Sequence, residues 1–193
     1  SPYSASKGSA DLIATSFNKT YGTKIKILNL TNNYGPYQFP EKFIPTLISY
    51  FLKNERAPIY GKGTNVREWM YVDDSCNAIW KSIVSKNNFE KMNIGSGVRI
   101  SNLEIAKTVF KIMKSQNLTN LRYNNFVKMV KDRPGHDKRY ALNTNFFKNN
   151  INYKIKKNLY LGLTETVNWY IENNKWVRNV NKSYNFKRLG LID

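Results

Sequence analysis

Apolar residues in this chain recur with two different periods. Near the N-terminus, Leu12, Ile13 and Phe17 recur at helical spacing, and Gly22 stands where such a helix would end. The stretch KIKILNL at 24–30 instead alternates polar and apolar residues, which is typical of a short strand. The chain is therefore predicted to open with a helix followed by a strand.

The middle of the chain repeats this alternation of elements. A loop rich in Asn, Gly and Pro leads to a predicted helix over 44–54. Residues 57–74, APIYGKGTNVREWMYVDD, indicate a strand, a glycine turn and a second strand. Asp73 or Asp74 is expected to cap the helix that follows over 75–84.

The C-terminal part continues in the same order. A strand is predicted in KMNIGSG at 91–97, and the helix over 101–115 begins with the capping-box spacing S-N-L-E. Residues 130–142 are predicted to be a loop with a strand entering it, and the amphipathic segment 163–174 to be a closing helix. Strands that alternate with helices predict an α/β fold, in which ligands bind beyond the carboxyl ends of the strands.

The glycines do not form a dinucleotide-binding fingerprint. Gly95 and Gly97 make an isolated G-x-G, and Ile100 stands where a third glycine would be needed. We interpret this segment as a turn.

Charge is the strongest compositional signal. The 193 residues have a formal net charge of +18, which alone would suggest nucleic acid or another anionic partner. The lysines are scattered along the chain, with no basic block, no metal-ligand spacing and no nucleic-acid-binding motif. Nucleic acid is therefore not the expected partner, and a phosphate-bearing small ligand would also suit this positive charge.

Other classes are excluded on composition. No apolar run approaches the roughly 20 residues that cross a bilayer, so no membrane association is expected. The single Cys76 rules out an internal disulfide and fits a reducing cytoplasm. With 41% hydrophobic residues, the chain can bury one core or two small lobes that share one.

Tyr3 and Lys7 form the clearest candidate for chemistry. Residues four apart on a helix share a face, so the phenol and the ammonium would project side by side. A neighbouring cation lowers the pKa of a tyrosine from about 10, which allows proton exchange with a substrate hydroxyl. The alternative is an ordinary surface pair.

Several motifs in register carry a family resemblance. YSASK is followed by NNYGPYQFPEKFIP, PIYGKGTNVREWMYVDD, MNIGSG, DRPGHDKRYAL, TVNWY and KWV. This series resembles the extended short-chain dehydrogenase/reductase family, and within it the nucleotide-sugar 4,6-dehydratases, most closely those acting on dTDP-glucose. The resemblance covers nearly the whole chain.

The resemblance implies a fold and its division into domains. It implies the C-terminal half of an NAD-binding Rossmann fold, residues 1–34 and about 64–98, with a small mixed α/β substrate-binding domain, residues 35–63 and about 99–193. In that family the Gly-rich NAD loop and a Thr-Asp-Glu catalytic stretch belong to an N-terminal half, which we expect to be absent here.

The resemblance also implies roles for individual residues. Tyr3 would take the proton from the sugar O4, Lys7 would hold the nicotinamide ribose, and Asn33 would contact NAD. Arg67 and Arg133 would grip the diphosphate, a task suited to a guanidinium. The substrate-binding positions implied are Asn32, Lys42, Phe43, Pro58, Ile59, Tyr60, Arg67, Asn102, Asp132, Arg133, Pro134, Gly135 and His136. Phe43 is a departure, because leucine is commoner there in the family.

Each position also has a purely structural interpretation. Asn32 and Asn33 could be turn formers, Arg67 could pair with Asp73 or Asp74, and His136 could lie on the surface. We interpret a further set of aromatic residues as core or interface: Trp69, Tyr71, Trp80, Trp169 and Trp176.

The implied reaction oxidises the sugar at C4, eliminates water across C5 and C6 and returns the hydride to C6, with NAD as the cofactor. The implied setting is deoxysugar biosynthesis in the cytoplasm, by a homodimer when complete. Two alternatives stay open. One is another nucleotide-sugar dehydratase or epimerase of the same family, and the other is a non-catalytic fragment that binds nucleotide sugar or a polyanion.

Overall fold

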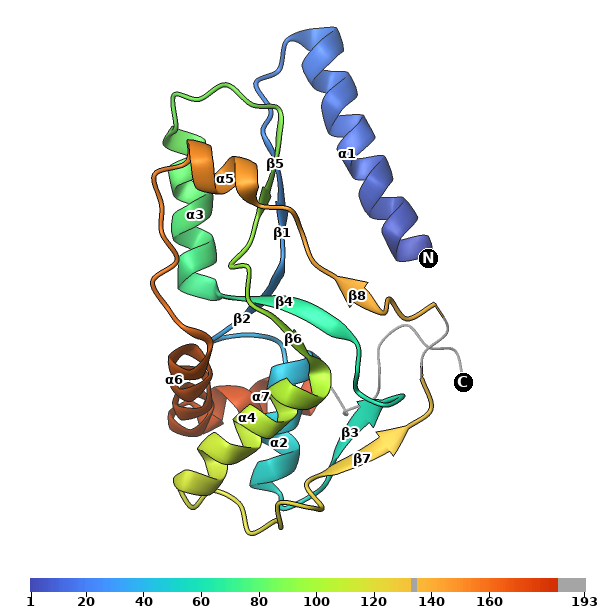
Figure 1. The fold of residues 1–193 in the computed structure, drawn as a ribbon, viewed down its shortest axis with the longest axis vertical. Helices are drawn as coiled ribbons and strands as arrows, with labels where there is room; N and C mark the ends of the chain where they lie inside the picture. Colours follow the sequence, from blue (N-terminus) through green and yellow to red (C-terminus); the bar gives the residue numbers. More distant parts are fainter. Residues whose placement is uncertain (133–134, 184–193) are drawn as a thin grey trace.

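The computed structural model describes residues 1–132 and 135–183, and it alternates helices with strands (Figure 1). The elements in chain order are α1 (Pro2–Tyr21), β1 (Ile27–Leu30), β2 (Asn32–Tyr34), α2 (Phe43–Leu52), β3 (Ala57–Tyr60), β4 (Val66–Tyr71), α3 (Val72–Val84), β5 (Lys91–Ile94), β6 (Arg99–Ser101), α4 (Asn102–Ser115), β7 (Val127–Val130), β8 (Arg139–Tyr140), α5 (Asn145–Asn150), α6 (Leu159–Glu172) and α7 (Asn174–Ser183). The predicted α/β class is confirmed. The short helix α5 and the final helix α7 were not predicted.

Strand β4 is the centre of the largest sheet. It pairs in parallel with β2 and with β8, and antiparallel with β6. Two smaller parallel pairs flank it, β1 with β5 and β3 with β7. The two strands predicted within 57–74 are therefore present, and each pairs with other parts of the chain.

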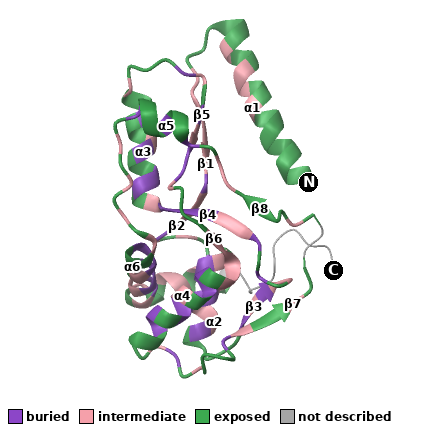
Figure 2. Ribbon diagram, in the orientation of Figure 1, coloured by how far each residue is buried: buried purple, intermediate pink, exposed green. Residues whose placement is uncertain are grey.

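Buried side chains form two clusters. In the lower part of Figure 1, the facing sides of α2, α4 and α6 bury a cluster that includes Phe51 and Phe110, whose ring centroids lie 5.4 Å apart. In the upper part, Met92 on β5 and Phe147 on α5 belong to a second cluster beside α3. Figure 2 shows the buried residues on these inward faces. Since burial of a large apolar side chain contributes about 1.5–3 kcal/mol, these clusters hold the strands in place.

Helix α1 lies apart from both clusters. It starts with Pro2, ends at Gly22 in the left-handed conformation (φ 65°), and buries none of its residues (Figure 2). Leu12 is 73% exposed and Phe17 50% exposed. An ion pair of 2.5 Å between Asp11 and Lys91 connects the helix to β5. The predicted helix is confirmed, and its apolar stripe faces outward.

The expected cap on α3 is wrong. Strand β4 leads directly into the helix, so α3 begins at Val72 after Tyr71, and neither aspartate is in a capping position. Asp74 is buried in the first turn and accepts hydrogen bonds from the backbone N–H groups of Lys156 (3.0 Å) and Lys157 (2.9 Å) and from the Tyr153 hydroxyl. Burial and this carboxylate raise the pKa of Tyr153 above its usual range.

The capping box of α4 is confirmed. The Ser101 hydroxyl accepts from the N–H of Glu104 (3.3 Å), and the Glu104 carboxylate accepts from the N–H of Ser101 (3.1 Å). The bonds from the side chain and backbone of Ser101 lower the pKa of Glu104. This local motif fixes the start of the helix next to β6.

Two glycine-to-alanine substitutions distinguish the effect of helix propensity on stability from the effect of tertiary packing. A Cβ on Gly95 would lie 2.3 Å from Oε1 of Glu68 and 2.6 Å from Cγ2 of Thr31, whereas one on Gly8 meets nothing within 4 Å. We expect Gly95→Ala to lower the free energy of unfolding by about 1–3 kcal/mol through overpacking. Gly8→Ala, in the exposed helix α1, should raise it by about 0.5–1 kcal/mol. Urea unfolding of both variants measures this, and equal shifts would contradict the packing around Glu68.

Candidate functional site

A cleft of about 450 Å³ opens between α2, β3 and β4. It gathers most of the side chains predicted to bind substrate, from six separate segments of the chain. These residues are Asn32, Lys42, Phe43, Pro58, Tyr60, Arg67, Asn102 and His136. Because they converge from distant positions in the sequence, the structure supports the cleft as the candidate binding site.

The alternation of strand β3 explains one exception. Ala57 and Ile59 are buried in the core, whereas Pro58 and Tyr60 face the cleft, since side chains alternate between the two faces of a strand. Ile59, only 1% exposed, therefore packs in the core and does not line the cleft.

Arg67 is anchored by backbone carbonyls. Its Nη1 donates to the carbonyl oxygen of Val66 and its Nη2 to that of Asp137, both at 2.8 Å. Asn65 donates to the same Asp137 carbonyl at 3.2 Å. Asp74 binds the segment before α6 and is not the partner of Arg67. The guanidinium is thereby fixed at the cleft wall by its own strand and by the segment that leads into β8.

Two buried nitrogen atoms in the cleft wall have no hydrogen-bond partner in the described part of the chain. The His136 side chain is 4% exposed, and its Nδ1 lies 2.6 Å from Oδ1 of Asp132, while its Nε2 is unpartnered. Nε1 of Trp69 is likewise buried and unpartnered. Because buried polar groups are nearly always hydrogen-bonded, these two nitrogens indicate a binding surface.

Aromatic rings line the same cleft. Phe43 stacks on Trp69 with ring centroids 6.2 Å apart, and Tyr60 contacts His136 edge-on at 6.4 Å. Phe43, which replaces the leucine common in the family, thus keeps an apolar wall. Together with Lys42 and Arg67, these rings suit a ligand with an aromatic part and an anionic part.

Some lining residues were missed from the sequence: Pro40, Glu41, Thr46, Tyr50 and Trp69. Thr46 and Tyr50 lie four apart on α2, on the helix face that carries Phe43, so helical spacing could have found them. Trp69 was interpreted as a core residue. It is 4% exposed, and it shares the face of β4 with Arg67 because they are two residues apart.

The remaining predicted residues lie elsewhere. Tyr3 is 74% exposed on α1, Lys7 is exposed one turn further along, and neither lines the cleft. Asn33 on β2 accepts a hydrogen bond from the Ser75 hydroxyl. Asp132 is not a lining residue of the cleft but contacts His136, which is one. Gly135, between them in the chain, has a φ of 63°. The predicted positions Arg133 and Pro134 are outside the described residues.

The order of elements and the cleft define a class by architecture: an α/β chain of the short-chain dehydrogenase/reductase fold with a ligand-sized cleft beside its central strand. Residues 1–166 match the family described as GDP-mannose 4,6 dehydratase, and the chain belongs to this family. The resemblance found in the sequence is thereby confirmed.

Individual relatives are consistent with this family. A probable dTDP-glucose 4,6-dehydratase of Sinorhizobium fredii is 38% identical over all of this chain and 55% of its own length. The dTDP-glucose 4,6-dehydratase of Bacillus anthracis, solved with NAD, superposes with a TM-score of 0.83 at 37% identity, covering 93% of this chain and 55% of that one. The Streptomyces venezuelae enzyme, also with NAD, has a TM-score of 0.83 at 36% identity, with coverage of 93% and 53%. The chain therefore spans about half the length of these relatives.

None of the helices in the described part of the chain combines the length and apolar character needed to cross a membrane.

The anchoring of Arg67 makes a testable prediction about local stability. Arg67→Ala removes the bond to the Asp137 carbonyl, so the adjacent bond from the Val66 N–H to the Lys138 carbonyl should open more often. Loss of about 1 kcal/mol of local stability corresponds to roughly tenfold faster amide exchange at Val66. Hydrogen exchange measured by NMR checks this. The Trp69 N–H, bonded to the Val98 carbonyl, is the internal control, and equal acceleration at both would contradict the anchoring role.

Proposed function

We propose that this chain is the nucleotide-sugar-binding portion of an NAD-dependent dTDP-glucose 4,6-dehydratase of the cytoplasm. The observation that carries the proposal is the cleft itself, in which Arg67, Lys42, aromatic rings and two unpartnered buried nitrogens converge. The similarity to dTDP-glucose 4,6-dehydratases at 36–38% identity supports dTDP-glucose as the substrate.

Within the cleft, each kind of group has a role. Tyr60 and Phe43 offer apolar faces to the thymine base and the deoxyribose. Arg67 and Lys42 supply positive charge to the diphosphate, and Arg133 is proposed as a second guanidinium. The unpartnered nitrogens of Trp69 and His136 are available to oxygen atoms of the ligand.

The proposed proton acceptor is Tyr3. It lies four residues before Lys7 on α1, and the ammonium of Lys7 has no ion-pair partner among the described residues. In this role the Tyr3 oxygen takes the proton from the sugar O4, and Lys7 holds the nicotinamide ribose.

The residues of this chain suit the nicotinamide ribose of NAD but not its pyrophosphate. The exposed phenol and ammonium of Tyr3 and Lys7 can hold a ribose, whereas the given sequence contains no G-x-G-x-x-G turn to hold the pyrophosphate. When bound, NAD supplies reversible acceptance of hydride. A ketone at C4 of the sugar would acidify the C5 proton and allow loss of water. The carboxyl pair implied for that step belongs to the N-terminal half, so we propose that this chain alone does not turn over.

The outward stripe of α1 supports a further part of the proposal. Ile13, Phe17 and Tyr21 are spaced four residues apart and are all at least half exposed, and the rings of Phe17 and Tyr21 lie 5.4 Å apart. A stripe of this kind is typical of a helix that packs against another helix. We propose that the complete enzyme is a homodimer.

Calorimetric titration of this chain with dTDP, UDP and GDP tests the proposed ligand. We expect dTDP to bind most tightly, and Arg67→Ala to weaken it by about 2–5 kcal/mol if the diphosphate contact is buried. Lys107→Ala removes a positive charge from the exposed face of α4 and should leave the affinity within about twofold, since screened surface charges act weakly.

The outcomes separate the alternatives. A preference for UDP or GDP would favour another dehydratase or epimerase of the family. Salt-sensitive binding of a short DNA duplex, without nucleotide binding, would replace the enzyme assignment with a polyanion-binding module.

Turnover is tested in a chimera that places the N-terminal half of the Sinorhizobium fredii relative before Ser1. Tyr3→Phe deletes the proton acceptor, so we expect turnover of dTDP-glucose to fall by about 10²–10⁴-fold, with little change in dTDP affinity. Tyr21→Phe is the matched control, because Tyr21 is another exposed tyrosine (72%) of the same helix. Unchanged turnover in Tyr3→Phe, or an equal loss in the control, would overturn the role of Tyr3.

A further inference from the structure

A second hollow, of about 570 Å³, lies beside β6, β8 and α5. Three of its lining side chains are cationic, and each comes from a different element: Arg99 from β6, Arg139 from β8 and Lys148 from α5. None of its lining residues is acidic or aromatic. The full set is Gly97, Arg99, Arg139, Ala141, Leu142, Asn143, Thr144, Asn145 and Lys148.

The register of β4 places this hollow on the opposite side of the sheet from the nucleotide cleft. Arg67 and Trp69 face the cleft, so Glu68 between them faces the other way. Glu68 is paired with Arg99 across β6, and Val66, on the same face as Glu68, is paired with Arg139 across β8. The two cations therefore belong to the face that the cleft does not use.

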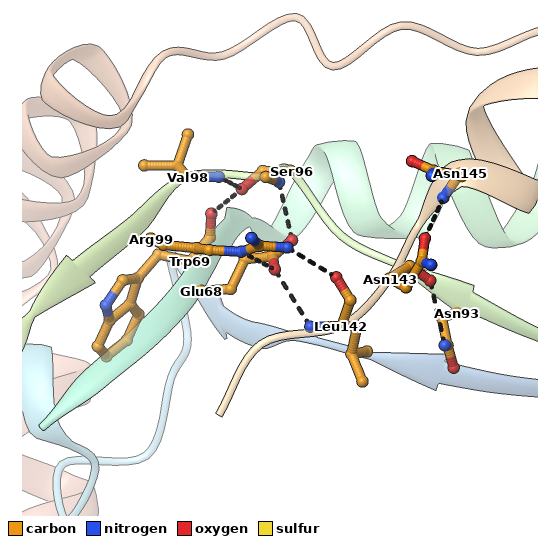
Figure 3. A network of polar contacts seen from close by, with 10 residues as sticks. Glu68, Trp69, Asn93, Ser96, Val98, Arg99, Leu142, Asn143 and Asn145 are labelled. Atoms are coloured by element: carbon orange, nitrogen blue, oxygen red, sulfur yellow. Dashed lines mark hydrogen bonds and ion pairs between the residues drawn. The ribbon is translucent and has the colours of Figure 1, made fainter. Parts of the chain in front are cut away.

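A buried carboxylate fixes the floor of the hollow. Glu68 is 0% exposed and accepts hydrogen bonds from the N–H groups of Gly97 (2.8 Å) and Leu142 (3.3 Å), with Nε of Arg99 at 3.5 Å (Figure 3). Nη2 of Arg99 also donates to the Leu142 carbonyl at 3.0 Å. Three lining residues are thus held in place by one buried group, which pre-organises the hollow for a ligand.

The neighbouring polar groups are ordered in the same way. The side-chain oxygen of Asn143 accepts from the N–H of Asn145 at 3.0 Å, and its carbonyl accepts from the Asn93 amide at 3.1 Å (Figure 3). Nζ of Lys148 lies 3.6 Å from the point where a Cβ of Gly97 would be. The absence of a side chain at Gly97 leaves this ammonium open to the hollow.

The hollow has more cationic than anionic side chains around it. Glu68 is matched by Arg99, while Arg139 and Lys148 have no carboxylate within 4.0 Å in the part of the chain that the structure describes. Guanidinium and ammonium groups that converge in a polar hollow are the usual receptor for phosphate oxygens. Without an aromatic wall, the hollow offers no stacking surface for a base.

We propose that this hollow is a second anion site, separate from the nucleotide cleft, that binds a small molecule carrying one or two phosphate groups. Its three cations line one hollow and come from three different elements, which favours a small anion over a nucleic acid, whose backbone needs cations along its length. The site does not depend on the proposed catalytic function, since none of its residues lines the cleft.

Inorganic pyrophosphate is the probe, titrated into the full chain and followed by amide NMR shifts and by calorimetry. We expect a single saturable binding event that shifts the amide signals of Gly97, Leu142 and Asn145. When dTDP is added first to occupy the cleft, pyrophosphate should leave the amide signals of Asn102 and Trp69 unchanged. The double variant Arg139→Gln/Lys148→Gln should weaken binding about tenfold or more, as expected for loss of two charged contacts.

A control variant distinguishes binding in the hollow from general attraction of the anion to the positive charge of the protein. Lys81→Gln/Lys107→Gln removes the same charge from the exposed surfaces of α3 and α4 and should change pyrophosphate affinity by less than about twofold. All four substitutions replace exposed side chains, so the amide spectra of the variants report directly whether each remains folded.

Four results would overturn the proposal. These are equal weakening by both double variants, shifts confined to the nucleotide cleft, shifts that do not saturate, or a short DNA duplex that shifts the same amides as strongly at equal phosphate concentration. Failure of dTDP to bind would reject the proposed function. It would not affect the test of the hollow, because pyrophosphate binding there is measured from the amide shifts of Gly97, Leu142 and Asn145.

Discussion

The structure depends on the fully buried carboxylate of Glu68. A charge removed from water is costly unless hydrogen bonds and an opposite charge compensate it. Glu68 obtains both, from the turn between β5 and β6 and from the segment after β8, which lie far apart in the chain. Its neighbour Gly95 has no room for a side chain for the same reason. The carboxylate thereby holds two connecting segments against the central strand.

Side chains along β4 point alternately to the two faces of the sheet, so each face carries different functional groups. Arg67 and Trp69 face the cleft, while Val66 and Glu68 face the segments that Glu68 binds. The same strand therefore positions the cleft and fastens the structure that supports it. A shift of one residue in register would exchange the faces and move the guanidinium away from the Asp137 carbonyl that now binds it.

The sequence predicted what is decided locally. The capping box of α4, the Gly22 end of α1 and the strands of alternating pattern depend on residues within a few positions of one another. The family motifs added the side chains that converge on the cleft, which no local pattern places together. What was missed is set by distant contacts: Asp74 binds the segment before α6, and Trp69 is at once buried and part of the cleft. Helix α5, six residues long, is too short for a periodic signal and is held by the packing of Phe147.

The cleft residues and the pair Tyr3 and Lys7 are held in place by different interactions. The cleft residues belong to strands and helices that bury two apolar clusters, so their positions follow from the core. Tyr3 and Lys7 belong to a helix with no buried residue. Surface ion pairs of the kind that contribute about 0–1 kcal/mol each connect this helix to Glu90 and Lys91 at the start of β5. Most of the stability of a helix in a protein comes from packing of its apolar face, and α1 buries none of its residues. Precise placement of the phenol therefore requires a surface that covers Leu12, Ile13 and Phe17, whereas binding in the cleft does not, and this difference makes ligand recognition separable from turnover in this chain.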